Sequence, residues 1–81
     1  MPIMTIRAIN ATFESVSTGE FASIDHAYRA AFLSGLDIVR DEVTRGAPGA
    51  IVELAVDIEG QRDAARGAVA LSTSRILASK A

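Results

Sequence analysis

The chain has 81 residues and no cysteine; 49% of its residues are hydrophobic, only 5% are aromatic, and its formal net charge is −2. A chain this short buries only about 60–65% of the surface that it exposes when unfolded, so we expect a single domain, residues 1–81, whose thin aliphatic core is supplemented by oligomerisation. The composition excludes disulfides and cysteine metal sites, and the acidic balance argues against nucleic acid as a partner because no basic stripe can neutralise phosphates.

Residues 3–17 alternate like a strand, but the alternation changes phase. The apolar side chains first lie on one face and then on the other: Met4, Ile6 and Ala8 share the first face, and Ile9, Ala11 and Phe13 share the second. A shift of one residue moves side chains to the other face of a sheet. Either a β-bulge lies near residues 8–10, or residues 10–12 form a turn between two short strands. We favour one long bent strand, followed by a turn at residues 17–20 and a short return strand at residues 20–22.

Residues 23–45 show the period of an amphipathic helix. Its apolar stripe comprises Ile24, Tyr28, Ala31, Phe32, Gly35, Ile38, Val39 and Val43. Ser23 is a suitable N-cap because its hydroxyl can accept a free backbone N–H of the first turn. Asp41 and Arg45 are spaced as a stabilising ion pair, and Gly46 ends the helix. We expect this helix to organise the fold, with its apolar stripe buried against a sheet.

Small residues recur every four positions along one edge of that stripe, at Ala27, Ala31 and Gly35. A glycine within a helix costs about 1 kcal/mol relative to alanine, so the spacing predicts that another element approaches closely there. The favoured interpretation is a helix lying tight on a sheet. The alternative is a helix-to-helix contact across a dimer axis.

Leu33 lies in the middle of the charged side of the same helix. A single exposed leucine is ordinary in a soluble protein. With Ala30 and Leu36 beside it, Leu33 could instead be the centre of a contact between subunits.

The second half of the chain predicts a hairpin. Residues 51–58 alternate cleanly and indicate a half-buried strand, and the charged, glycine-flanked residues 59–67 are typical of a long hairpin loop. For residues 68–77 we favour a strand, although residues 64–81 are rich enough in alanine to form a second helix. We expect residues 78–81 to be a frayed tail.

Few residues suggest chemistry. His26 is the only histidine and falls on the polar side of the helix without a nucleophile at a fitting spacing, so a solvated surface role is favoured over a ligand role. Arg62 and Arg66 occupy the glycine-flanked loop and could hold an anion, but the loop matches no phosphate-binding glycine pattern. We therefore predict no enzyme, no metal and no cofactor, and we retain His26, Arg62 and Arg66 as candidate ligand-binding residues.

The helix entry at residues 23–25, the strand at residues 52–57 and the Glu-Gly-Gln-Arg turn at residues 59–62 together resemble small bacterial ββαββ domains of unknown function. This resemblance covers most of the chain and implies a fold without an activity. A strand–helix–strand–strand order is also similar to dodecin, a flavin-storing assembly. Dodecin stacks its flavin on a tryptophan, a residue that this chain does not contain, so the similarity extends to topology only.

The sequence thus predicts an α+β fold in which one long helix packs on one face of a mostly antiparallel sheet of three or four strands, ordered ββαββ or βαββ. The expected function is a bacterial, cytoplasmic, self-associating interaction module, a homodimer in the first instance, without a membrane partner because no apolar run is long enough to span a bilayer. The candidate interface residues are Leu33, Ala30 and Leu36 on the helix, and Ile51 and Ala55 on the second face of the sheet. The alternative is an oligomer that binds a small ligand in a cleft between subunits.

Overall fold

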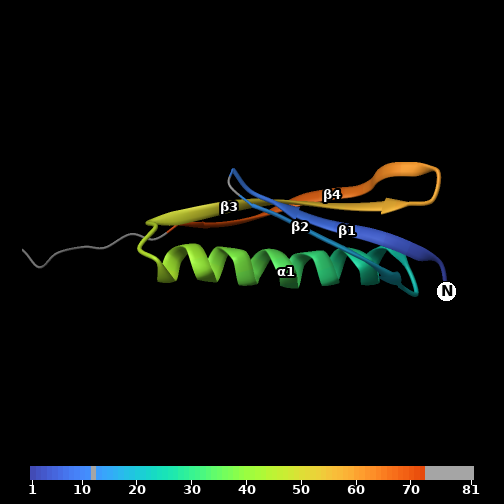
Figure 1. Cartoon of the computed structure of the whole chain (residues 1–81), viewed down its shortest axis with the longest axis horizontal. Coiled ribbons are helices and arrows are strands. Elements are labelled where there is room, and N and C mark those ends of the chain that lie inside the picture. Colours follow the sequence, from blue (N-terminus) through green and yellow to red (C-terminus); the bar gives the residue numbers. More distant parts are fainter. Residues whose placement is uncertain (12, 73–81) are drawn as a thin grey trace, which may run out of the picture.

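The computed structural model describes residues 1–11 and 13–72 and shows one helix lying along one face of a sheet (Figure 1). In chain order the elements are β1 (Ile3–Ile9), β2 (Glu14–Glu20), α1 (Ile24–Thr44), β3 (Gly49–Ile58) and β4 (Gln61–Ser72). Neighbouring strands are antiparallel, in the order β2-β1-β3-β4. The predicted α+β class is confirmed, and of the two predicted orders the structure has ββαββ. The dodecin-like order, with one strand before the helix, is not the one observed.

The change of phase in the first segment is a turn. β1 and β2 form a hairpin in which Ile3 is opposite Glu20 and Ile9 is opposite Glu14, and the backbone N–H of Asn10 donates to the carbonyl of Phe13 across the turn. The favoured single bent strand was therefore wrong. So were the turn at residues 17–20 and the return strand at residues 20–22, because β2 occupies the chain up to Glu20. β2 lies at the sheet's edge and is largely exposed, so its sequence needs no apolar alternation.

The helix follows its sequence closely. The hydroxyl of Ser23 accepts the backbone N–H of His26, as an N-cap does. At the other end the N–H of Arg45 donates to the carbonyl of Asp41, and Gly46 follows with a φ of 103°, a conformation that favours glycine. Arg45 also pairs with Asp41 at 3.2 Å. These predictions are confirmed because they depend on contacts within one turn of helix.

The small residues of α1 pack directly on the sheet, and Ala27, Ala31, Gly35 and Val39 are all buried. A Cβ added to Gly35 would lie 2.8 Å from Leu54 Cδ2 and 3.3 Å from Val69 Cγ2. The predicted close approach is therefore between helix and sheet. Phe32 departs from the expected buried stripe, because it is 39% exposed. The helix rests on its line of small residues, which leaves the larger Phe32 at the margin of the contact.

β3 and β4 form one long hairpin with a tight turn. Ile58 is opposite Gln61, and Gly60 in the turn has a φ of 78°. The predicted loop at residues 59–67 was wrong, since β4 begins at Gln61 and contains Arg62, Asp63 and Arg66. The predicted strand at residues 68–77 is confirmed as far as Ser72; residues 73–77 and the predicted tail at residues 78–81 lie outside the described residues. A register shift between Val56 and Ile58 marks a bulge near the turn.

The core lies between α1 and the facing side of the sheet. Its sheet residues alternate along three strands: Met4, Ile6 and Ala8 on β1, Val52, Leu54 and Val56 on β3, and Val69 on β4. The other face of the sheet carries no second layer within the described residues. Among those residues, no helix is long and apolar enough to cross a membrane.

Candidate functional site

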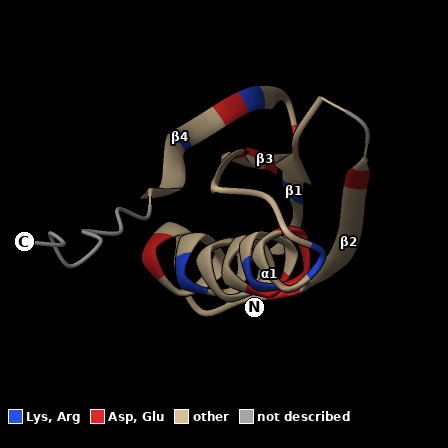
Figure 2. Cartoon of the chain, turned by 90° about the vertical axis from the view of Figure 1, so that its left-hand side faces the viewer, with Lys and Arg blue, Asp and Glu red and all other residues tan. Residues whose placement is uncertain are grey.

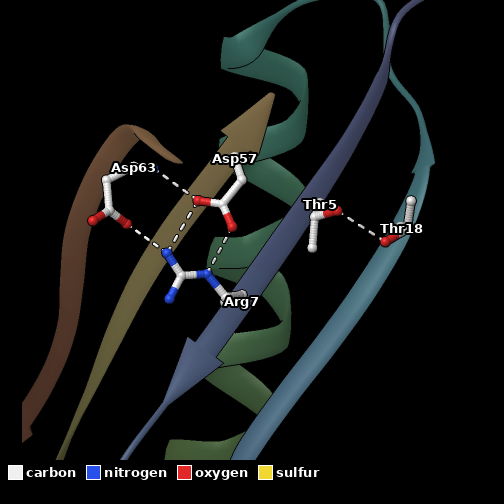
Figure 3. A network of polar contacts seen from close by, with 5 residues as sticks. All are labelled: Thr5, Arg7, Thr18, Asp57 and Asp63. Carbon is white, nitrogen blue, oxygen red and sulfur yellow. Dashed lines mark hydrogen bonds and ion pairs between the residues drawn. The ribbon is translucent and has the colours of Figure 1, made fainter. Parts of the chain in front are cut away.

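The uncovered face of the sheet holds a network of charged side chains from three strands (Figure 3). The Arg7 guanidinium lies on β1 and donates from Nε and Nη2 to the two carboxylate oxygens of Asp57 on β3, both at 3.0 Å. Nη2 also donates to Asp63 on β4. The backbone N–H of Asp63, a residue with a φ of 57°, donates to Asp57 Oδ1 at 2.8 Å. The network therefore ties the bulged end of the β3–β4 hairpin to the neighbouring strand β1.

The charges in this network are matched to one another. Hydrogen bonding from Arg7, followed by that from the Asp63 backbone N–H, lowers the pKa of Asp57 below its ordinary value. The same pairing raises the pKa of Arg7. A bidentate arginine–carboxylate pair has a fixed geometry, and the side chains of Arg7 and Asp57 are only 11% and 21% exposed. This cluster is built to hold strands together rather than to exchange protons.

The Asp57 pairing predicts a loss of stability in acid. The ordinary pKa of this carboxyl is 3.8 and its pKa in the folded protein is lower, so the pairing stabilises the fold fully well above pH 3.8 and is lost as the pH falls below that value. We expect the free energy of unfolding, measured with urea from pH 7 down to about pH 2, to lose this contribution as the pH falls below 3.8. Asp57→Asn should lower the free energy of unfolding by about 1 kcal/mol at pH 7 and flatten the acid slope. Asp41→Asn is the control, since its pair with Arg45 is exposed and contributes little. An unchanged slope in Asp57→Asn would contradict this assignment.

The sequence pattern does not predict this network, although the alternation of β1 and β3 places Arg7 and Asp57 on the face opposite the apolar residues of their strands. Asp57 and Asp63 are 50 and 56 residues from Arg7. Only the register of the sheet, which sets Arg7 next to these carboxylates, reveals the contact.

The three candidate ligand-binding residues are not brought together. His26 is exposed in the first turn of α1. Arg62 and Arg66 lie in β4 instead of a loop. Arg66 is opposite Ala55 on the face of the sheet that points away from α1, and Arg62 is close enough to Asp57 to lower the pKa of that carboxyl. His26 and Arg66 therefore lie on opposite sides of the sheet, and the ligand-binding role of each of the three residues stays a prediction.

An apolar groove runs between α1 and the edge strand β4. It encloses about 330 Å³ and is lined by Leu36, Val39, Arg40, Val43 and Thr44 of α1 and by Val69, Ala70 and Leu71 of β4. Leu36 and Leu71 remain 39% and 42% exposed. Residues 67–72 of β4 carry no charge, and Figure 2 shows the corresponding part of the strand in the neutral colour where it passes beside α1. Nothing in residues 1–11 and 13–72 covers the groove, which extends the core to the molecular surface.

The structure separates the candidate interface residues into two surfaces. Leu36 lines the groove, whereas Leu33, 57% exposed, lies outside it and Ala30 packs against the core. Ile51 and Ala55 lie on the uncovered face of the sheet, where Ile51 is 66% exposed but Ala55 only 4%. That face is interrupted by Glu53 between these two residues and by the Arg7 network. The groove is therefore the more continuous apolar surface, and the interface role of each residue stays a prediction.

A second hollow of about 360 Å³ lies between the β1–β2 turn and the last turns of α1. Its lining combines an aromatic ring with charged side chains: Phe13, Asp37, Ile38, Asp41, Glu42 and Arg45. Within residues 1–11 and 13–72, no group of histidine or acidic side chains is arranged to hold a metal ion. The carboxylates here are those of a solvated helix face.

Comparison of the chain with models of protein families, with curated proteins and with solved structures gave no match.

Proposed function

We propose that this protein is a non-enzymatic interaction module that associates with itself, as a homodimer, through the side of the molecule formed by α1 and β4. The observation that carries the proposal is the groove between these elements, whose apolar lining continues the core to the molecular surface. Leu36 and Leu71 leave about two fifths of their surface in water. Covering apolar surface is favourable by about 25 cal/mol per Å², and a domain this small has little other stability to spare.

The polar features support a structural role for the charged side chains. The most extensive cluster, Arg7 with Asp57 and Asp63, is internally matched and joins strands. A further ion pair, between Asp41 and Arg45, is exposed on the helix surface. Among the described residues, the apolar groove is thus a better candidate for function than either charged group.

Light scattering after size-exclusion chromatography tests the proposal. We expect a dimeric mass at micromolar concentration, and we expect Leu36→Lys to raise the dissociation constant at least tenfold, because an ammonium group in the groove would be buried beside Arg40 with no acidic side chain in the groove lining to pair with it. Leu33→Lys is the matched control: it makes the same change on the same helix at an exposed position outside the groove. A wild-type mass that stays monomeric at high micromolar concentration would end the proposal.

A further inference from the structure

The two edges of the sheet differ in how they are protected. An unpaired edge strand can recruit another strand, and proteins block this with charges, prolines or bulges. β2, at one edge, begins and ends with glutamate and carries serine and threonine between. β4, at the other edge, has its charges and its bulge at its start, near Asp63. Residues 67–72 carry no charge and no proline, so this end of β4 is open to pairing.

The unprotected end of β4 is also the part that lines the groove. Val69 and Leu71 point toward α1, because their cross-strand partners Val52 and Ala50 lie on the helix side of β3. A strand added at this edge would project every second side chain toward Leu36. Backbone pairing and burial of the groove would therefore be satisfied by one partner.

We propose that the partner is a second copy of this chain, and that the two β4 strands pair antiparallel with Val69 on the twofold axis. This inference rests on the proposed self-association and specifies its geometry. A twofold axis through an antiparallel strand pair stands perpendicular to the sheet, so both helices lie on the same face. The result is one continuous sheet of eight strands, in which the exposed edges are the two β2 strands.

The side chains of β4 favour this register. With Val69 on the axis, Ala68 is opposite Ala70 of the partner subunit, and Gly67 is opposite Leu71 of the partner subunit. Gly67 has no side chain on the helix side, and the Tyr28 hydroxyl occupies that space. Leu71 of the partner subunit would thus lie beside the hydroxyl and the ring edge of Tyr28, which gives an exposed leucine a neighbouring side chain. The small residues on the other face leave the backbones free to approach.

Both elements that line the groove would contribute to this interface. With Val69 on the axis, residues 66–72 of β4 face the same residues of the partner subunit. The flanking side of α1 adds apolar side chains, including Phe32, Leu36 and Val43. α1 contacts β3 more than any other strand, so with strands spaced by about 4.8 Å the two helices would lie roughly 14 Å apart. Directly packed helices are about 8–10 Å apart, and the exposed Phe32 and Leu36 side chains of both copies would fill the difference.

Cysteine crosslinking tests the register, and the natural chain has no cysteine to interfere. Ala68→Cys and Ala70→Cys change small, exposed residues. Directly opposite residues have Cβ atoms about 4.5–5.5 Å apart, whereas diagonal neighbours are about 7–8 Å apart, beyond the reach of a disulfide without backbone movement. We expect an equal mixture of the two variants, exchanged under reducing conditions and then oxidised, to give several-fold more covalent dimer than either variant alone.

Val16→Cys, at a 54% exposed position on β2, is the control and should give only background crosslinking. Two results would overturn the β4 pairing while leaving the proposed self-association in place, provided that light scattering shows a dimer. One is efficient crosslinking through Val16→Cys. The other is a yield of covalent dimer from the mixture of the two β4 variants that is no higher than the yield from either variant alone. A wild-type protein that is monomeric by light scattering would remove both.

Discussion

Replacing Leu54 by alanine is expected to lower the free energy of unfolding by about 2–5 kcal/mol. Leu54 is 1% exposed and is among the largest fully buried side chains of the described residues. It lies on β3 directly beneath Gly35 of α1, so its removal leaves a cavity at the centre of the contact between helix and sheet. A domain of this size has a total stability of roughly 4–12 kcal/mol, which makes the loss a large fraction of the whole.

The matched control for Leu54→Ala is Leu33→Ala, which deletes the same atoms from a side chain that is 57% exposed. Its effect should stay within about 0.5 kcal/mol. Urea unfolding followed by circular dichroism at one fixed protein concentration measures both, because the stability of a self-associating protein depends on its concentration. Equal effects of the two substitutions would contradict the assignment of Leu54 to the core.

Substituting Gly35 by valine is expected to destabilise the protein by about 1–3 kcal/mol. The first carbon of any side chain at this position would already meet Leu54 Cδ2 at 2.8 Å, and valine adds two further methyl groups. The effect should exceed the gain from replacing glycine in a helix, which is at most about 1 kcal/mol. Leu33→Val places the same residue at an exposed position of α1 outside the groove and reports the helix propensity of valine alone.

A double-mutant cycle shows whether Gly35 acts through Leu54. Because the added valine would overlap the leucine side chain, Gly35→Val should cost less in a Leu54→Ala background, and the coupling energy should be about 0.5–3 kcal/mol. Additive effects would mean that the glycine is required for another reason, such as contact with Val69, the next nearest side chain.

These contacts connect the core to the proposed interface. Val69 packs near Gly35 on its inner side and lines the groove at the sheet's edge. Substitutions at Val69 would therefore change both the stability of one subunit and the association of two. The exposed Leu36 and the open-face residues Ala68 and Ala70 are better probes of association, because each can be changed without opening the core.

The sequence by itself determined the helix and the strand β3. The Ser23 cap, the end at Gly46 and the close approach at Gly35 follow from interactions within a few residues, or from a side-chain period that a buried face imposes over many turns. β3 is paired with a strand on each side, and its alternate residues point toward the core: Val52, Leu54 and Val56. Because one face of each of these segments is buried, apolar residues recur at the period of the helix or strand, and the sequence alone predicts both elements.

Only the tertiary structure decided β2, the first half of β4, the Arg7 network and the groove. An edge strand has one neighbour and much exposed surface, so it folds without a regular apolar pattern. β2 and the first half of β4, which the sequence pattern did not predict, both belong to edge strands. Arg7 meets Asp57 and Asp63 only through the register of strands far apart in the chain. The groove likewise depends on how α1 packs on the sheet. α1 lies over the middle of the sheet, so Leu36 of α1 and Leu71 of β4 line a groove at the sheet's edge.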